Sequence, residues 1–543
     1  MATNATRAAR APPVSERQRS IIVIGGGMAG LAAGVHARRN GYDVRIFEQH
    51  TIPGGACTSW RRRGYLIDGC IHWLIGSLPG ATAHRLLDEV GALPAHGGPR
   101  LLPLTRYVLS TDEVTGRALD VTADLDRLDR DLRAAAAPQD APLLDDALDA
   151  IRAFRGFDMP PMRARDLDTN GLRELTRTMS PSGRSVLRAI NRHAGSIRHF
   201  ASAARSPFLR WLWPALVHPD LPAWCVFMLL AQLVDGQLSV VEGGSLELAL
   251  AVARRYAALG GAIEYRASVE EILVEGDRAV GVLLEGGREE RADVIVSAVD
   301  LHATLHRLLD DRYTSPALRE RFAAWRIFDP IVMTSFGVTR TFPDAPHYRH
   351  VRLDRPLSVA GHETSDLGVR VFNYDPTLAP PGRTVVQALV PAEWDTWAAL
   401  RAAPDRYAAE KDRLAAAIAA RLDRYLPGFT PSIDLVDVAT PLTFADYTRC
   451  HRGAYEGWIP TVEALRRGVP ATLPGLAGFH LAGQWVEPGG GVHAAIHSGR
   501  CVVETLCAED GHAFIANLIA SGYQGKIVPV NPNAAPWPNP GPP

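Results

Sequence analysis

The sequence predicts an α/β protein in which a domain built on a parallel sheet is interleaved with an α+β domain. Three observations lead to this fold class. A β-branched run, Ile21–Ile24, is followed at once by the pattern Gly25-x-Gly27-x-x-Gly30. A second glycine run, Gly489–Gly491, precedes a helix-like stretch near the end of the chain. The long segments between them have mixed helical and alternating patterns, which indicates that the second domain is inserted into the first.

The first glycine motif lies in a complete strand–helix–strand unit. The strand IIVI leads into it, the helix-like stretch LAAGVHARRNG follows, and a second strand, DVRIFE, ends in Glu48. Gly25 permits a tight turn, Gly27 lets the backbone approach a pyrophosphate, and Gly30 allows close helix–strand packing. The helix N-terminus supplies amide donors and a positive dipole. The unit therefore predicts a Rossmann-type dinucleotide-binding domain.

The residues after this unit favour FAD over other dinucleotides. Glu48 lies 18 residues beyond Gly30, where a carboxylate can accept hydrogen bonds from a ribose diol. The same carboxylate would repel the 2′-phosphate of NADP. The pair Gly54-Gly55 follows six residues after Glu48, and a second close approach of the backbone suits the extended FAD molecule better than NAD.

The stretch GGGMAGLAAGVHARRNGYDVRIFEQHTIPGGACTSW, residues 25–60, resembles the N-terminus of the phytoene desaturase and carotenoid isomerase family of flavoproteins, which also includes retinol saturases. The resemblance covers about residues 20–508 and implies a glutathione-reductase-like FAD-binding domain. That family commonly has an arginine after the glycine pair, where this chain has Ala56. The run Arg61–Arg63 either replaces that contact or is a solvated group of charges.

The later segments extend the resemblance. A helix predicted over Ser245–Leu259 and the strands after it are similar to the family's central FAD-binding segment. In that family the strand residue matching Val269 binds the adenine end through its backbone. The strand in ADVIVSAV returns to the same sheet and brings Ser297 near the dinucleotide. In a flavoprotein of this family, the helix expected after Gly489–Gly491 would point its amides at the N1–C2=O edge of the flavin, which becomes anionic on reduction.

The resulting domain limits and cofactor contacts are as follows. The FAD-binding domain is expected over residues 20–109, 236–304 and 466–508, and the substrate-binding domain over 110–235 and 305–465. Residues 1–19 are predicted to be a disordered tail, and residues 509–543 a C-terminal tail. The residues predicted to bind FAD are Gly25, Gly27, Met28, Ala29, Gly30, Glu48, Gln49, Gly54, Gly55, Ala56, Val269, Ser297, Gly483, Gly490, Gly491 and Val492.

Composition excludes several classes of function. The chain has 58 basic and 59 acidic residues, and this balance argues against nucleic acid as a partner. None of the six cysteines forms a CxxC pair or a zinc-like spacing, so free thiols and no metal site are expected. The only lysines are Lys411 and Lys526, which argues against the lysine that amine oxidases often place near flavin N5.

The resemblance implies an FAD-dependent oxidoreductase of phytoene desaturase type. A hydride would pass from a hydrophobic polyene to flavin N5, and a proton would leave the neighbouring carbon, in an apolar tunnel that aligns the chain on the ring. His72 is either the proton acceptor or a core histidine, and Glu487 is a second catalytic candidate. Trp73, Tyr455, Trp458 and Trp485 are expected on the substrate side, with the tryptophans in packing or stacking roles.

Four alternatives to desaturation stay open at this point. They are cis–trans isomerisation with reduced flavin, saturation of a double bond as in retinol saturases, oxidation of another lipophile, and a non-enzymatic flavin-binding scaffold. No second complete nucleotide motif occurs, so electrons are expected to leave the flavin directly, to oxygen or a quinone.

A cytoplasmic location is expected, because the chain has no apolar run of spanning length and no signal-peptide pattern. The segment Ser206–Val234 is rich in tryptophan, proline and apolar residues. It either dips into a membrane surface to admit a lipophilic substrate or forms a buried helical core.

Overall fold

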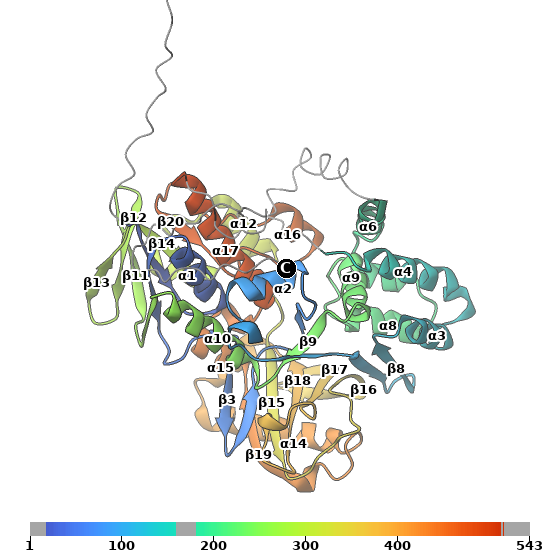
Figure 1. Ribbon diagram of the computed structural model, residues 1–543. Coiled ribbons are helices and arrows are strands. Elements are labelled where there is room, and N and C mark those ends of the chain that lie inside the picture. The colour runs from blue at the N-terminus through green and yellow to red at the C-terminus, as the bar shows by residue number, and fades with distance from the viewer. Residues whose placement is uncertain (1–17, 159–180, 512–513, 515–543) are drawn as a thin grey trace, which may run out of the picture.

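A computed structural model describes residues 18–158, 181–511 and 514 of the 543-residue chain. It has a parallel sheet covered by helices, a large mostly antiparallel sheet, and a separate group of helices (Figure 1). The predicted α/β fold class is confirmed. The N-terminal tail lies outside the described residues except for Gln18 and Arg19, and so does most of the C-terminal tail, in which Phe514 is described and buried.

The parallel sheet unites strands from three separate stretches of the sequence. All four pairings between its five strands are parallel, and Ile21, Ile22 and Val23 are fully buried, as in a sheet covered on both faces. The strands predicted from IIVI, DVRIFE and ADVIVSAV are thereby confirmed as members of one sheet. Their spatial order is β10 (Ala262–Tyr265), β2 (Asp43–Glu48), β1 (Ser20–Ile24), β14 (Val294–Ser297) and β20 (Phe479–Leu481).

Three helices pack together beside this sheet: α1 (Met28–Arg39), α10 (Ser245–Ala258) and α17 (Gly491–Glu509). The predicted helix over Ser245–Leu259 is confirmed, with Leu259 as its C-cap. Helices α1 and α17 approach very closely, because a Cβ at Gly499 would lie 2.4 Å from the carbonyl oxygen of Ala29. The two helices that start at the two glycine runs are therefore in direct contact (Figure 1).

The structure also has three small sheets and a short helix, and the β4 strand (Tyr65–Asp68) of one small sheet packs against the large sheet. Hairpin strands after β10 form the first, the second is a two-stranded ribbon, and the third joins the turn before α2 to the start of α10. Their bounds are β11 (Val269–Glu275), β12 (Arg278–Leu284) and β13 (Arg288–Arg291); β3 (Ser59–Arg62) and β4 (Tyr65–Asp68); β5 (Leu74–Ile75), β9 (Leu238–Val241) and β6 (Leu101–Pro103); and α2 (Thr82–Glu89).

The large sheet has seven strands, and among them only the β16–β7 pairing is parallel. Strand β7 begins at Arg106 and ends at Asp112, so it crosses the domain limit that the sequence places between residues 109 and 110. The division of the chain into two domains stays a prediction. The order is β19 (Ile433–Ala439), β15 (Ile331–Val338), β18 (Thr384–Pro391), β17 (His362–Val371), β16 (Tyr348–Val359), β7 (Arg106–Asp112) and β8 (Arg117–Thr122). Helices α13 (Trp394–Leu400), α14 (Pro404–Leu422) and α15 (Pro441–Thr448) pack on this sheet. Helices α11 (Leu301–Ala303), α12 (Pro316–Ala324) and α16 (Val462–Arg467) share a core with strands of the parallel sheet instead.

The separate helical group contains the segment Ser206–Val234. In that segment Phe208, Trp213 and Phe227 are buried in the group's own core, and within it only Pro207 and Arg210 are exposed. This packing favours a buried core for the segment. Among the described residues, no helix has both the length and the apolar character needed to cross a bilayer. The helices are α3 (Leu125–Ala135), α4 (Ala141–Phe154), α6 (Pro181–Arg192), α7 (Ile197–Ser202), α8 (Pro207–Ala215) and α9 (Ala223–Val234).

Candidate active site

A cavity of about 780 Å³ lies where the parallel sheet, the large sheet and the helical group meet. Its size falls within the range of roughly 300–1,000 Å³ that is typical of ligand and cofactor sites. Its wall includes both glycine runs and the loop after β2. Apolar side chains from α9, β15 and β18, among them Met228, Met333 and Leu389, also line it.

Most of the residues predicted for the site line this one cavity, although they come from distant parts of the chain. Four predicted residues do not line it: Gly30, Ser297, Trp458 and Glu487. Those that do are Gly25, Gly27, Met28, Ala29, Glu48, Gln49, Gly54, Gly55, Ala56, His72, Trp73, Val269, Tyr455, Gly483, Trp485, Gly490, Gly491 and Val492.

The first glycine run is tied to the loop after β2 by backbone contacts and by one carboxylate. Glu48 accepts hydrogen bonds from the backbone N–H of Gly26 at 2.7 Å and of His50 at 2.8 Å. The N–H of Gly54 donates to the carbonyl of Gly26 at 2.9 Å. Gly27, the N-cap of α1, has no side chain to cap the helix, so the first amides of α1 are left for a ligand at the cavity wall.

Gly30 and Ser297 support the site from outside the cavity. A Cβ at Gly30 would lie 2.0 Å from the carbonyl oxygen of Gly25, so glycine is needed there for helix–strand packing, as the motif predicts. The Ser297 hydroxyl is hydrogen-bonded to the Thr304 hydroxyl at 2.8 Å. Both residues shape the wall without facing a ligand.

The arginines at 61–63 do not replace the side chain that Ala56 lacks. Residues 61–63 are exposed, none lines the cavity, and Arg62 lies 3.4 Å from Asp437. The solvated reading of this charge run is the one that the structure supports.

The second glycine run also lines the cavity. Gly489, Gly490 and Gly491 all have positive φ, at +115°, +59° and +79°, which favours glycine at each position. Gly490 is the N-cap of α17 and offers no side chain to its amides. A Cβ at Gly490 would lie only 2.7 Å from both the Cβ and the carbonyl oxygen of Glu456. The run therefore packs directly on the Tyr455–Gly457 turn.

His72 faces the cavity, and its loop is held by buried charges. The Arg370 guanidinium donates to the carbonyl of Ile71 at 2.7 Å and lies 3.7 Å from the buried carboxylate of Asp68. Removal from bulk water, with a smaller effect of the Arg370 charge, lowers the pKa of His72 to about 3. His72 is thus neutral near pH 7 and is a weak base.

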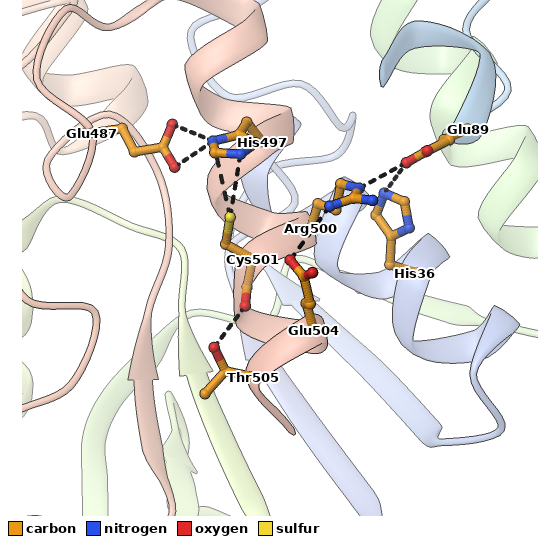
Figure 2. Close-up of polar contacts among 8 residues, drawn as sticks. All are labelled: His36, Glu89, Glu487, His497, Arg500, Cys501, Glu504 and Thr505. Atoms are coloured by element: carbon orange, nitrogen blue, oxygen red, sulfur yellow. Dashed lines mark hydrogen bonds and ion pairs between the residues drawn. The ribbon is translucent and has the colours of Figure 1, made fainter. Parts of the chain in front are cut away.

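Glu487 does not face the cavity. Its carboxylate oxygens lie 2.7 and 2.9 Å from Nδ1 of His497, and Sγ of Cys501 lies 3.4 Å from Nε2 of the same ring (Figure 2). Burial acts to lower the pKa of His497, but the hydrogen bonds to Cys501 and Glu487 outweigh it and raise the pKa to about 10. Glu487 is therefore engaged in an ion pair with His497 and does not line the cavity, and its catalytic role stays a prediction.

Trp458 also lies outside the cavity, while Trp485 reaches it. Trp458 is 1% exposed, and its ring stands edge-on to Trp485 with centroids 5.0 Å apart. Trp458 therefore packs behind Trp485, which agrees with the packing role expected for the tryptophans. Trp73 lines the cavity beside Tyr107, at a centroid distance of 6.3 Å.

Sequence reasoning missed one side chain with evident chemical potential, Glu456. It lines the cavity, and burial raises the pKa of its carboxyl to about 7. A single glutamate between Tyr455 and Gly457 belongs to no motif. The only signal in the sequence is a charged residue inside an otherwise apolar, glycine-containing stretch, GAYEGW.

The family model described as flavin containing amine oxidoreductase matches residues 28–507, well over half of the chain. The chain belongs to this family. As a member of the flavin containing amine oxidoreductases it is an FAD-dependent oxidoreductase. Lys411, on α14, does not line the cavity, and Lys526 lies outside the described residues.

Curated relatives and solved structures agree with this assignment. The chain is 22% identical over 514 residues to phytoene desaturase (lycopene-forming) from Paracoccus sp. (strain N81106 / MBIC 01143), covering 91% of this chain and 98% of that one. It is 27% identical over 298 residues to the chloroplastic prolycopene isomerase of Arabidopsis thaliana, covering 54% of this chain and 49% of that one. The similarity to the desaturase and isomerase family predicted from the sequence is confirmed.

Two solved structures show the same fold. An oxidoreductase from Methanosarcina mazei aligns with a TM-score of 0.57 at 16% identity, over 89% of this chain and 100% of that one. Wild-type putrescine oxidase bound to putrescine aligns with a TM-score of 0.57 at 15% identity, over 91% of this chain and 99% of that one.

The residues present fit FAD. At Gly27 and Gly491, which both line the cavity, no atom of another part of the chain lies closer than about 3.9 Å to an added Cβ, so that space is open to a ligand. Both helices that start at the two glycine runs begin at the cavity without a side-chain cap. Glu48 spends one lone pair of each oxygen on a backbone amide and keeps others for hydroxyl donors. These are the donors and acceptors that a diphosphate, a ribose and a flavin ring require.

Proposed function

We propose that this flavoprotein desaturates a lipophilic polyene of the carotenoid class. The observation that carries the proposal is the shape of the cavity, which continues from the two glycine runs into an apolar region between α9 and the large sheet. Carotenoid desaturases and isomerases among the relatives support this class of substrate. An extended apolar chain needs such a wall more than it needs polar contacts.

The chain's own residues would divide the work along the cavity. The amides that start α1 would hold the diphosphate, Glu48 the adjacent ribose, and the backbone at Val269 the adenine end. The amides that start α17 would face the ring edge that becomes anionic on reduction. Bound FAD would accept the hydride. Trp73 and Tyr455 would hold the polyene over the ring.

Isomerisation with reduced FAD is a second candidate, because prolycopene isomerase is among the relatives. It differs from desaturation in that no net electrons leave the substrate. Contact with a membrane surface is a further proposal. The choice of oxygen or a quinone as electron acceptor is another, and measurements of oxygen uptake and quinone reduction can test it directly.

The deciding experiment mixes the FAD-loaded protein with phytoene in liposomes without oxygen and records the flavin and polyene spectra together. Desaturation predicts bleaching of the flavin and a polyene band at longer wavelength, with one double bond formed per flavin reduced. Isomerisation predicts no bleaching, and conversion only of a cis polyene after chemical reduction of the flavin. Substrate-free liposomes give the control. A flavin that stays oxidised with phytoene, together with polyenes that stay unchanged before and after chemical reduction of the flavin, would refute both candidates.

A further inference from the structure

We propose that Glu456 takes up the proton that the substrate loses during desaturation. The proposal rests on the proposed function and adds the acid–base residue that this reaction needs. His72, the acceptor considered from the sequence, faces the same cavity, so the two must be compared as bases.

The position of Glu456 is fixed against the second glycine run. Its Cβ and carbonyl oxygen fill the space beside Gly490, where an added Cβ would come within 2.7 Å of each. Gly490 starts α17, whose amides line the end of the cavity that fits the flavin ring. The Glu456 carboxyl therefore enters the cavity beside the ring site, which is where a substrate carbon must lie to lose a hydride.

The Glu456 carboxylate has no hydrogen-bond donor or cation paired with it anywhere in the described part of the chain. Other acids on the cavity wall are already engaged. Glu48 accepts two backbone amides, and Asp300 accepts the N–H of His451 at 2.8 Å and of Ala303 at 3.0 Å. A carboxyl that faces the cavity, away from bulk water and with no hydrogen-bond partner among the described residues, is costly to maintain, which indicates a function for it.

Two histidines and three tyrosines that line the cavity with Glu456 are uncharged near pH 7. Burial lowers the pKa of His72 to about 3 and that of His493 to about 4, so both rings are neutral. Burial raises the pKa of Tyr348 to about 12 and raises those of Tyr107 and Tyr455 as well, so these phenols stay protonated. No neighbouring charge sets the pKa of Glu456, and its value of about 7 is the effect of burial.

This pKa makes Glu456 the better base of the two candidates. A general base works best when its pKa lies near the working pH. His72, with a pKa of about 3, holds a proton far more weakly than Glu456, with a pKa of about 7. Transfer of a proton from carbon to Glu456 is therefore more favourable in free energy than transfer to His72.

The step balances as follows. One C–H bond breaks with its electron pair, and the hydride goes to FAD, the oxidant already assigned to the protein. The C–H bond on the neighbouring carbon breaks, its electron pair becomes the new C=C bond, and its proton goes to a Glu456 oxygen. The neutral acid then returns the proton to water.

The test compares Glu456→Gln with the exposed control Glu463→Gln in anaerobic stopped-flow reduction by phytoene, between pH 5.5 and 9. We expect the wild type and the control to reduce faster as pH rises, by about tenfold per unit below a midpoint near 7. Glu456→Gln should bind phytoene within threefold of wild type but reduce at least about 100-fold more slowly, with no midpoint. Glu456→Asp should keep the midpoint.

A readout without substrate accompanies the kinetics. The absorbance of bound flavin should shift with a midpoint near pH 7 in the wild type and in Glu456→Asp, and not in Glu456→Gln, because only a carboxyl beside the ring ionises there. Reduction of Glu456→Gln at the wild-type rate and with the wild-type pH profile would overturn the proposal. If no polyene reduces the flavin of the wild type, the proposed function is refuted, and the proton transfer with it. The absorbance titration separately decides whether Glu456 ionises beside the ring.

Discussion

Replacing Glu487 by glutamine tests whether this residue belongs to an internal ion pair or to the catalytic cavity. The substitution keeps the size of the side chain but removes the charge that faces His497. Without it, the pKa of His497 should fall from about 10 toward or below its ordinary value of 6.5. The variant should therefore lose stability relative to the wild type by an amount that depends on pH, while FAD binding is largely kept.

The size and sign of the effect follow from the pKa. The shift from 6.5 to about 10 corresponds to at most about 5 kcal/mol, since one pKa unit is worth about 1.4 kcal/mol. Part of this free energy comes from the hydrogen bond to Cys501, and the Glu487 side chain is 26% exposed, so that solvent screens its charge. The His497–Glu487 pair is therefore expected to contribute about 2–3 kcal/mol to the free energy of unfolding. Because the folded pKa is raised, this stability is complete below pH 6.5 and disappears as pH rises through about 10.

The assay is the melting temperature of wild type and Glu487→Gln in steps from pH 5.5 to 10. The variant should melt below the wild type at pH 6, and the gap should close toward pH 10. Glu463→Gln, which removes an exposed pair with Arg467, should shift melting little at any pH. A gap of the same size at every pH, or a loss of polyene turnover with normal melting, would refute the internal ion pair as the role of Glu487.

Two further predictions concern the cofactor end of the cavity. Gly499→Ala should destabilise the protein by about 1–3 kcal/mol and lower its FAD content, because the new methyl would lie 2.4 Å from the Ala29 carbonyl. Gly195→Ala, whose methyl would meet only a ring atom of His199 at 3.6 Å, is the control, and normal FAD content in Gly499→Ala would contradict this. Glu48→Ala should weaken FAD binding about 10- to 100-fold, because the N–H groups of Gly26 and His50 lose their acceptor. The Kd is measured by flavin fluorescence, and an unchanged Kd would show that Glu48 takes no part in FAD binding.

The features that could be predicted from the sequence are those encoded in a short stretch of chain. The motif from Gly25 to Gly30 and the run Gly489–Gly491 need particular backbone angles and close approaches, so glycine itself is the signal. The buried parallel strands are recognisable from β-branched runs for the same local reason. Each of these predicted elements lies within a residue or two of its expected place.

The features that could not be predicted depend on contacts between distant segments. The direction of the Glu487 side chain is set by His497, which lies one turn and a half into the next helix. Strand β7 crosses the expected domain limit because its partner, β16, lies more than 200 residues further along the chain. The free carboxyl of Glu456 is recognisable only once the surrounding donors are seen to be engaged elsewhere.

The arrangement of the two glycine runs explains why cofactor binding and folding should be coupled in this protein. Each run starts a helix, and the two helices touch through Gly499 and Ala29, so neither run can move without the other. The ligand that spans both helix starts therefore contacts one packed unit, and its binding free energy adds to the stability of that unit. A second contact fixes Glu456: its turn packs on Gly490, so the geometry that would hold the flavin ring also positions this residue.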